Sequence, residues 1–306
     1  MTQSVDKAQE WQIEVEQRLV QFVRAQFDIS AKRAKSLIER GHFSIGGQVC
    51  KKPGFNLKTN TLVRYQPQGP VSAGPFGVQK VYIDSHLVIV DKPSGLLSAP
   101  QEGHKEASAL SAARRFCQKG GRGPKVVHRL DKSTSGLLAF GRGVDSTRIL
   151  GSQLEDRTMN RTYKAVVEGT PKQPSGIIES RLVSNTGRGK RGSLPNTFRV
   201  HPKAYALTPQ DEGHGKWSAT QYEVLWTRKG VSGIALKLVT GRTHQIRIHL
   251  AELGTPICGE PVYGRTKHKG RLALHAGELV LVHPITKEIK RFESPWPESL
   301  RRFWVW

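Results

Sequence analysis

A single carboxylate, Asp131, lies in a short polar segment that could carry nucleophilic or acid–base chemistry. Residues 127–136 read VHRLDKSTSG and lead directly into an apolar run. The three basic side chains around the aspartate favour the ionised form of its carboxyl group. An ionised carboxylate can act as a nucleophile or as a base. The same residue types also build structural turns, in which Asp, Ser and Thr side chains bond to the nearby backbone.

Other familiar sites fail on spacing. Residues 187–190, GRGK, suggest a phosphate-binding loop, but such a loop would need Gly in place of Ser184 and Ser or Thr in place of Arg191. His244 and His249 are five residues apart, whereas a helical zinc pair is four apart, and no cluster of acidic residues indicates a magnesium site. The sequence therefore predicts neither a metal nor a cofactor.

The chain is strongly basic. Its 306 residues include 48 Lys and Arg against 25 Asp and Glu, which gives a net charge of +23. Such an excess repels itself unless a polyanion neutralises it, so nucleic acid is the first partner expected and an anionic membrane surface the second. Hydrophobic residues make up 37%, enough for buried cores. The sequence contains no run of 18 apolar residues, so we expect no membrane-spanning helix. Its three scattered cysteines fit a reduced, cytosolic protein.

Residues 1–66 predict a small module of helices and a hairpin. Apolar residues that recur every four positions, among them Val15, predict a helix over 11–27. Ser30 could cap a second helix, Ala31–Arg40. The runs Phe43–Ile45 and Gln48–Val49 flank two glycines, which is a hairpin signal.

The second predicted helix has a basic face. Its cations are Lys32, Arg33, Lys35 and Arg40, and the hairpin is followed by two more, Lys51 and Lys52. Such a face is ordinarily a solvated surface; the alternative here is a contact with RNA. The order of helix, basic helix, Gly and hairpin resembles the small RNA-binding module of the ribosomal protein S4 type.

The rest of the chain predicts a linker and a larger domain. Residues 67–77 contain three prolines and three glycines without apolar periodicity, which is typical of a linker. Across 78–306, short β-branched runs alternate with helical stretches, so we expect an α+β fold with a large mixed, mostly antiparallel sheet and flanking helices. The polar residues 184–216 hold six Lys and Arg against two Asp and Glu and predict a long basic loop.

Those expected elements are short and spread along the whole larger domain. The predicted strands are Val81–Ile83, Leu87–Val90, Gly136–Phe140, Tyr163–Val167, Gln221–Trp226, Gly233–Val239 and Leu279–Val282, and the predicted helices lie near Ser108–Cys117, Ser146–Glu155 and Thr243–Glu252.

Four ordered segments resemble one known family. Residues 128–136, HRLDKSTSG, are similar to the HRLDxxTSG signature of RNA pseudouridine synthases of the RluA type. The segments DKPSGL at 91–96, RTYKA at 161–165 and GRTHQIRIH at 241–249 follow in the order of that family. The resemblance covers roughly residues 78–298. It implies an isomerase that converts uridine to pseudouridine in RNA without a cofactor or a metal.

The resemblance also implies roles for single residues. Asp131 matches the catalytic aspartate, Tyr163 the tyrosine that packs on the target base, and Arg242 the arginine that pairs with the aspartate. Arg129 matches an arginine that fills the space left by the extruded base, with a simple phosphate contact as the alternative. His128 is either an RNA contact or a structural histidine.

The competing hypothesis is a non-catalytic RNA-binding or ribosome-assembly protein that kept the fold. A metal-dependent nuclease is disfavoured because acidic ligands are missing. An attached module of the S4 type resembles those of enzymes that act on large-subunit ribosomal RNA, so we expect that target rather than transfer RNA. We also expect a cytoplasmic monomer.

Overall fold

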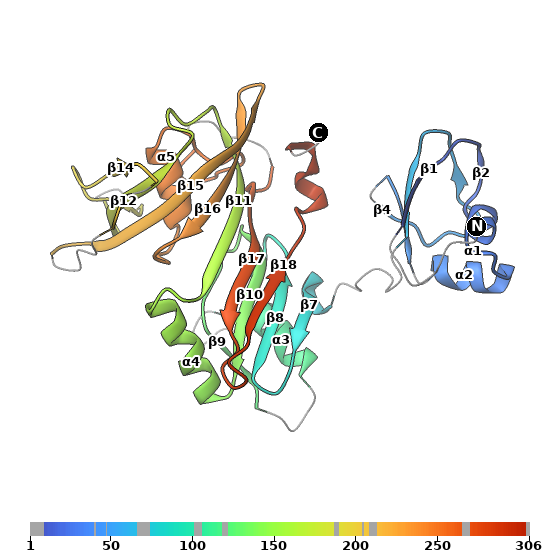
Figure 1. The fold of residues 1–306 in the computed structure, drawn as a ribbon, viewed down its shortest axis with the longest axis horizontal. Coiled ribbons are helices and arrows are strands. Elements are labelled where there is room, and N and C mark those ends of the chain that lie inside the picture. The colour runs from blue at the N-terminus through green and yellow to red at the C-terminus, as the bar shows by residue number, and fades with distance from the viewer. Residues whose placement is uncertain are drawn as a thin grey trace. The chain divides into compact units, whose positions relative to one another are not determined.

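The chain folds into two compact units, Met1–Gly74 and Pro75–Trp306, each with its own hydrophobic core. The computed structural model describes residues 9–39, 41–46, 48–65, 74–100, 106–117, 122–186, 190–203, 205–207, 213–264 and 270–303 (Figure 1). The division between the units falls within segment 67–77, most of which lies outside the described residues.

The N-terminal unit packs two helices on a small antiparallel sheet. The sheet order is β1-β6-β3-β4, and a separate short pair joins β2 to β5. The elements are β1 (Gln9–Gln12), β2 (Gln17–Arg18), α1 (Leu19–Phe27), α2 (Ala31–Glu39), β3 (Phe43–Ile45), β4 (Gln48–Val49), β5 (Asn56–Leu57) and β6 (Leu62–Tyr65). The second helix and the hairpin expected from the sequence are thereby confirmed.

The first helix is shorter than its apolar spacing predicted, so the prediction over 11–27 was wrong at its start. It begins at Leu19, while residues 9–12 form a strand paired with β6. Val15, counted as part of the apolar stripe, is 69% exposed. A four-residue repeat therefore continued by chance into an extended segment, because propensity alone does not reveal that β6 offers a pairing edge.

The larger unit is built on one twelve-stranded sheet. Its main order is β13-β12-β15-β16-β11-β17-β10-β8-β7, with β14 added to β12, β18 to β17 and β9 to β10. The strands are β7 (Gln79–Ile83), β8 (Leu87–Lys92), β9 (Pro124–Val126), β10 (Ser135–Arg142), β11 (Asn160–Glu168), β12 (Ser175–Val183), β13 (Gly192–Ser193), β14 (Arg199–His201), β15 (Lys216–Arg228), β16 (Val231–Leu238), β17 (Leu274–Val282) and β18 (Ile289–Glu293).

Pairing in this sheet is antiparallel except between β10 and β17. The mixed, mostly antiparallel α+β fold is thus confirmed, and so are the strands and helices expected in this unit. None of the described helices is both long and apolar enough to cross a membrane.

Helices cover both faces of the sheet. Strand β10 alternates between them: Leu137 and Ala139 join the core under α4 (Val144–Glu155), whereas Leu138 and Phe140 join the core that includes residues of α3 (Ala109–Phe116) and α5 (Gln245–Glu252). Short 3-10 helices occupy Pro75–Gly77 and Glu298–Phe303. In Figure 1, α4 lies beside β9 and β10, and α5 lies over the β12–β16 end of the sheet.

The composition of the segment 184–216 predicted one long loop, and that prediction was wrong. Its described part contains β13 and β14, which pair with β12, and ends in the start of β15. Each of the two added strands is two or three residues long. Strands of that length give no period-2 signal in the sequence, and backbone hydrogen bonds to β12 create them.

The parallel pairing of β10 with β17 fixes the end of the Asp131 loop, where it joins the sheet. Gly136 opposes Ala276 across β10 and β17, and Tyr163 opposes the same Ala276 across β11 and β17. A Cβ on Gly136 would lie 2.2 Å from the Ala276 carbonyl oxygen, and the residue has a φ of +117°. Only glycine therefore fits this close approach. The register brings the Asp131 segment and Tyr163 to within two strand spacings, about 10 Å.

Candidate active site

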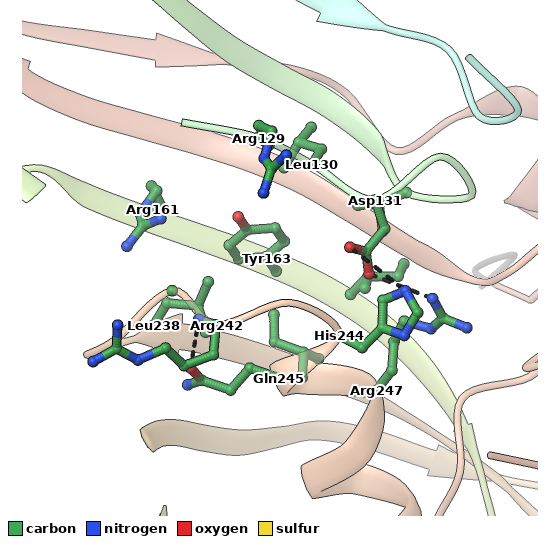
Figure 2. A pocket seen from close by; sticks show the side chains of 14 residues that line it. Arg129, Leu130, Asp131, Arg161, Tyr163, Leu238, Arg242, His244, Gln245 and Arg247 are labelled. Atoms are coloured by element: carbon green, nitrogen blue, oxygen red, sulfur yellow. Dashed lines mark hydrogen bonds and ion pairs between the residues drawn. The ribbon is translucent and has the colours of Figure 1, made fainter. Parts of the chain in front are cut away.

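Segments that are far apart in the sequence line one pocket (Figure 2). Asp131 comes from the loop before β10, Tyr163 from β11, and Arg242 from the turn before α5. The three residues that the sequence proposed as catalytic therefore share one cleft.

The Asp131 loop is held by the DKPSGL segment that precedes it in the chain. The Lys92 ammonium donates hydrogen bonds to the carbonyl oxygens of Pro93 (3.0 Å), Leu96 (2.8 Å) and Lys132 (3.3 Å). Ser94 Oγ donates to the Ser133 carbonyl at 2.7 Å. The loop is thus clamped through backbone atoms, which fixes its path whatever side chains it carries.

A second clamp acts just before the aspartate. Ser98 Oγ donates to the Leu130 carbonyl at 2.7 Å and accepts from the Leu130 N–H at 2.9 Å. Lys92 is fully buried, and this burial lowers its pKa to about 7. The attraction of Asp131 opposes that shift. A buried ammonium that satisfies three carbonyls beside a carboxylate rigidifies the loop.

Arg247, not Arg242, is the ion-pair partner of Asp131. Arg247 Nη1 lies 3.5 Å from Asp131 Oδ2, and His244 Nε2 lies 4.0 Å from Oδ1. The Arg242 backbone N–H donates to Gln245 Oε1, and its side-chain Nε donates to the Trp217 carbonyl at 3.4 Å. The predicted pairing of Arg242 with Asp131 is therefore corrected: Arg242 is exposed at the rim of the pocket.

Glu260 holds Arg247 from the other side. Its carboxylate accepts two hydrogen bonds from the guanidinium, at 2.8 and 2.7 Å, and a third from the Val262 N–H at 2.9 Å. Burial would raise the pKa of Glu260, but these hydrogen bonds outweigh it and the pKa lies below its usual value. Burial likewise opposes the charge of Arg247, and the hydrogen bonds to Glu260 raise its pKa. The guanidinium therefore stays charged and points one edge at Asp131.

Two other residues of the GRTHQIRIH segment, Gln245 and His249, are structural. Gln245 is buried; its oxygen accepts from Thr240 Oγ1 and its amide donates to the Ala219 carbonyl at 2.9 Å. His249 is fully buried between Ser180 Oγ (3.0 Å) and Thr220 Oγ1 (2.9 Å), and burial lowers its pKa to about 3. These contacts dock α5 on β12 and β15 and so place Arg247.

Tyr163 presents its ring to the pocket from the middle of the sheet (Figure 2). The residue is 4% exposed, and the register between β11 and β17 shifts between Thr162 and Tyr163. Burial raises the pKa of its phenol. At neutral pH the side chain is therefore an uncharged aromatic surface with a hydroxyl, suited to stacking against a base.

Arg129 and Arg161 add positive charge next to the ring. Both line the pocket, and Arg129 is exposed. His128 differs: it is 8% exposed, its Nε2 accepts a hydrogen bond from the Ala139 N–H at 3.2 Å, and burial lowers its pKa to about 3. Of the two alternatives left open for His128, its position favours the structural histidine over an RNA contact.

A wider cleft adjoins the pocket. Its lining shares Asp131 with the pocket and includes five arginines: Arg129, Arg157, Arg161, Arg191 and Arg242. Guanidinium groups bind phosphate with two parallel hydrogen bonds, so a row of them suits a nucleic-acid backbone. Within the described residues, no group of His, Cys, Asp and Glu could hold a metal ion.

The basic face expected in the N-terminal unit is present where it is described. Lys32, Arg33 and Lys35 are exposed on α2, whose Ala34 and Ile38 are buried. Lys51 and Lys52 are exposed as well, and Arg40 lies outside the described residues. Ser30 caps α2 by accepting a hydrogen bond from the Arg33 N–H at 3.3 Å.

Sequence reasoning missed Arg247, His244, Arg161 and Glu260. Three of them stand inside the motifs that it used, but the spacing there does not say which arginine turns toward the aspartate. One signal was available for Arg247. Arg247 lies four residues after the start of the predicted helix Thr243–Glu252, between Ile246 and Ile248, and an arginine in such an apolar setting requires a carboxylate partner if it is buried.

Comparison with known proteins places these features in one group. The pattern of the family described as RNA pseudouridylate synthase matches residues 86–252, and that of the S4 domain matches residues 17–63. The chain is 30% identical to a ribosomal large subunit pseudouridine synthase D of Zymomonas mobilis, over 89% of this chain and 88% of that protein. It is 31% identical to the protein of that name from Pseudomonas aeruginosa, over 92% and 89%.

Solved structures show the same fold. The chain matches the human RNA pseudouridylate synthase domain containing 4 with a TM-score of 0.56 and 21% identity, over 76% of this chain and 93% of that chain. The human RNA pseudouridylate synthase domain containing 1 gives a TM-score of 0.54 and 24% identity, over 71% and 83%.

Proposed function

The chain belongs to the RNA pseudouridylate synthases, and we propose that it isomerises uridine in large-subunit ribosomal RNA with Asp131 as the reacting group. The observation that carries the role of Asp131 is its position: one carboxylate, paired with a buried arginine, in a pocket shared with an aromatic ring. The reaction breaks the bond between N1 of uracil and C1′ of ribose. The base rotates while held, C5 bonds to C1′, the C5 proton leaves, and N1 takes up a proton.

Asp131 needs both charge and access for this step. Its side chain is 21% exposed, so it faces the pocket while Arg247 and His244 approach its two oxygens. The fixed guanidinium keeps a negative charge stable in a site from which bound RNA excludes water. The isomerisation itself oxidises and reduces nothing, and no group enters or leaves the nucleotide except the exchanged proton.

The target base must leave the RNA stack before it can reach Asp131. Extruding a base from a stack costs a few kcal/mol. The ring of Tyr163 offers a surface on which the flipped uracil can stack, worth on the order of 1–3 kcal/mol. Arg129, exposed beside the pocket, can fill the gap in the RNA or bind a phosphate, and the arginines of the adjoining cleft suit the flanking backbone.

The choice of ribosomal RNA is supported by the names of the relatives from Zymomonas mobilis and Pseudomonas aeruginosa and by the S4 match. We expect purified protein to release tritium from C5 of labelled uridine in a large-subunit ribosomal RNA transcript at a rate at least about tenfold higher than from a pool of transfer RNA. Equal or reversed rates would contradict the proposed target. We also propose that the enzyme is a cytoplasmic monomer. Sedimentation of the full chain at micromolar concentration tests the monomeric state.

The N-terminal unit is proposed to grip RNA through the exposed face of α2. Replacing Lys32, Arg33 and Lys35 by Gln should weaken RNA binding and reduce the slope of log K against log salt by about 0.7 for each lost phosphate contact. Filter binding between 50 and 300 mM salt, within the range where such contacts are screened, measures this slope.

The matched control replaces three exposed lysines of the larger unit that lie outside the pocket, Lys80, Lys172 and Lys229, by Gln. This variant loses the same charge and should keep a steeper slope than the α2 variant. The same slope for both variants would remove the α2 face from RNA binding.

A further inference from the structure

A chain of polar side chains lies at the base of the Asp131 loop, where β10 begins. Arg271 Nη2 donates to Ser135 Oγ at 2.5 Å, and Ser135 Oγ lies 2.8 Å from His275 Nδ1. His275 Nε2 lies 3.0 Å from Ser294 Oγ, and Ser294 Oγ donates to Asp91 Oδ2. The chain thus links a cation to an anion through three neutral groups.

The chemistry of the donors sets one direction along this chain. A carboxylate only accepts, so Ser294 Oγ donates its single hydrogen to Asp91 and must accept from His275 Nε2. Nε2 therefore carries a proton, and in the neutral ring Nδ1 lacks one. The Nε2 proton faces Ser294 Oγ and, at 3.4 Å, the Ser294 carbonyl. At the other end, Ser135 Oγ donates to the unprotonated Nδ1 and accepts from Arg271.

The hydrogen-bonded side chains between Arg271 and Asp91 are buried, so losing one of their hydrogen bonds would be costly. His275 is 1% exposed and Ser135 is 3% exposed. Burial lowers the pKa of His275 to about 4, and the nearby charges of Arg271 and Lys164 also disfavour its protonation. The Trp296 ring meets the imidazole edge to face. The ring is therefore neutral at physiological pH, as the direction of the chain requires.

The chain connects four strands at the point where the loop joins the sheet. Ser135, four residues after Asp131, pairs with His275 in the parallel register of β10 and β17. Asp91 belongs to β8 on the other side of β10. Ser294 follows β18, and its backbone N–H donates to the Gly277 carbonyl at 2.8 Å.

We propose that this chain, from Arg271 through Ser135, His275 and Ser294 to Asp91, positions the Asp131 loop, and that His275 acts in it as the tautomer with its proton on Nε2. The inference rests on the proposed function, in which Asp131 is the reacting group. His275 is a positioning residue, since it acts on Asp131 through Ser135 and β10. Misplacing a reacting group by about 1 Å costs on the order of 100-fold in rate.

The first test reads the tautomer directly. In full-length protein labelled with ¹⁵N histidine, long-range proton–nitrogen spectra should show an unprotonated Nδ1 and a protonated Nε2 for His275, unchanged between pH 5.5 and 8. The His275→Asn variant assigns these signals by their loss. A protonated Nδ1 in this range would overturn the direction of the chain.

The second test separates positioning from packing. Ser135→Ala should lower kcat for C5 proton release by about 10- to 100-fold with KM within about threefold, as for other groups that orient a reacting residue. The matched control is Ser299→Ala. Ser299 Oγ accepts a hydrogen bond from Arg271 Nη1 at 2.7 Å but is not part of the hydrogen-bonded series from Arg271 to Asp91. The Ser299→Ala variant should therefore stay within about twofold of the parent enzyme.

A conservative replacement completes the test. The Oδ1 of Asn can accept from Ser135 much as Nδ1 does, so His275→Asn should keep more of kcat than His275→Leu does. Equal kcat losses in Ser135→Ala and Ser299→Ala, or in the two His275 variants, would overturn the positioning role. The tautomer is read without substrate, so this part stands or falls separately from the proposed function, which fails if Asp131→Asn keeps its activity.

Discussion

Asp131→Asn should abolish release of the C5 proton while leaving RNA binding within several-fold of the parent protein. Asn has nearly the shape of Asp but lacks the charge and the nucleophilic oxygen. Loss of the central reacting group of an enzyme costs on the order of 10⁴-fold or more. Arg247 keeps its two hydrogen bonds to Glu260, so the pocket should remain folded. Tritium release and filter binding measure the two effects on one preparation.

The control for this change is Asp145→Asn, which alters an exposed carboxylate on α4 in the same way. This variant should release tritium at the parent rate. Unchanged release by Asp131→Asn would remove this residue from the mechanism and return the chain to the reading of a non-catalytic RNA-binding protein that kept the fold.

Arg247→Met should give the second largest effect, because it removes the cation that partners both Glu260 in the folded structure and Asp131 in the reaction. The Glu260 carboxylate, whose side chain is fully buried, would be left without its cation. Stranding a buried ion in this way costs about 3–5 kcal/mol of unfolding free energy. Asp131 would also lose its nearest cation, so we expect C5 proton release to fall by about 100-fold or more. Urea unfolding and tritium release measure the two losses.

A second variant keeps this prediction testable if Arg247→Met folds poorly. Pairing Arg247→Met with Glu260→Leu removes both buried charges, which is often neutral or stabilising. The double variant should regain much of the lost unfolding free energy without regaining activity. Recovery of activity along with stability would show that Arg247 serves folding alone.

Arg242→Ala gives the contrast. Arg242 is exposed, so its loss should change the unfolding free energy by about 0.5 kcal/mol or less. Its effect should fall on KM for RNA, since it lines the cleft rather than pairing with Asp131. An Arg242 variant that loses activity as fully as the Arg247 variant would reverse the assignment made from the ion-pair geometry.

Much of this site could be foreseen from local pattern. The HRLDKSTSG segment announced a carboxylate among cations at the start of a strand, and Gly136 is required there by its close approach to Ala276. The DKPSGL segment was matched to the family but not explained by spacing. Its purpose lies in hydrogen bonds from Lys92 and Ser94 to backbone carbonyls about 40 residues away, and such bonds leave no period in the sequence.

The two errors about the fold share one cause. The first helix was extended too far because Val15 fits a four-residue repeat, yet pairing of β1 with β6 decided the segment. The loop 184–216 hid two short strands because β12 supplies their hydrogen bonds. In both places a partner strand from elsewhere in the chain outweighed the local preference.

The sequence by itself determined the family, the α+β fold and the carboxylate proposed to react, because these depend on residue types at fixed short spacings. Only the tertiary structure decided which arginine pairs with Asp131. Arg242 and Arg247 stand five residues apart in one motif, and the docking of α5 turns Arg247 inward between Glu260 and Asp131 and leaves Arg242 at the rim. Partners in an ion pair are chosen by position in space, and that position depends on packing between distant segments.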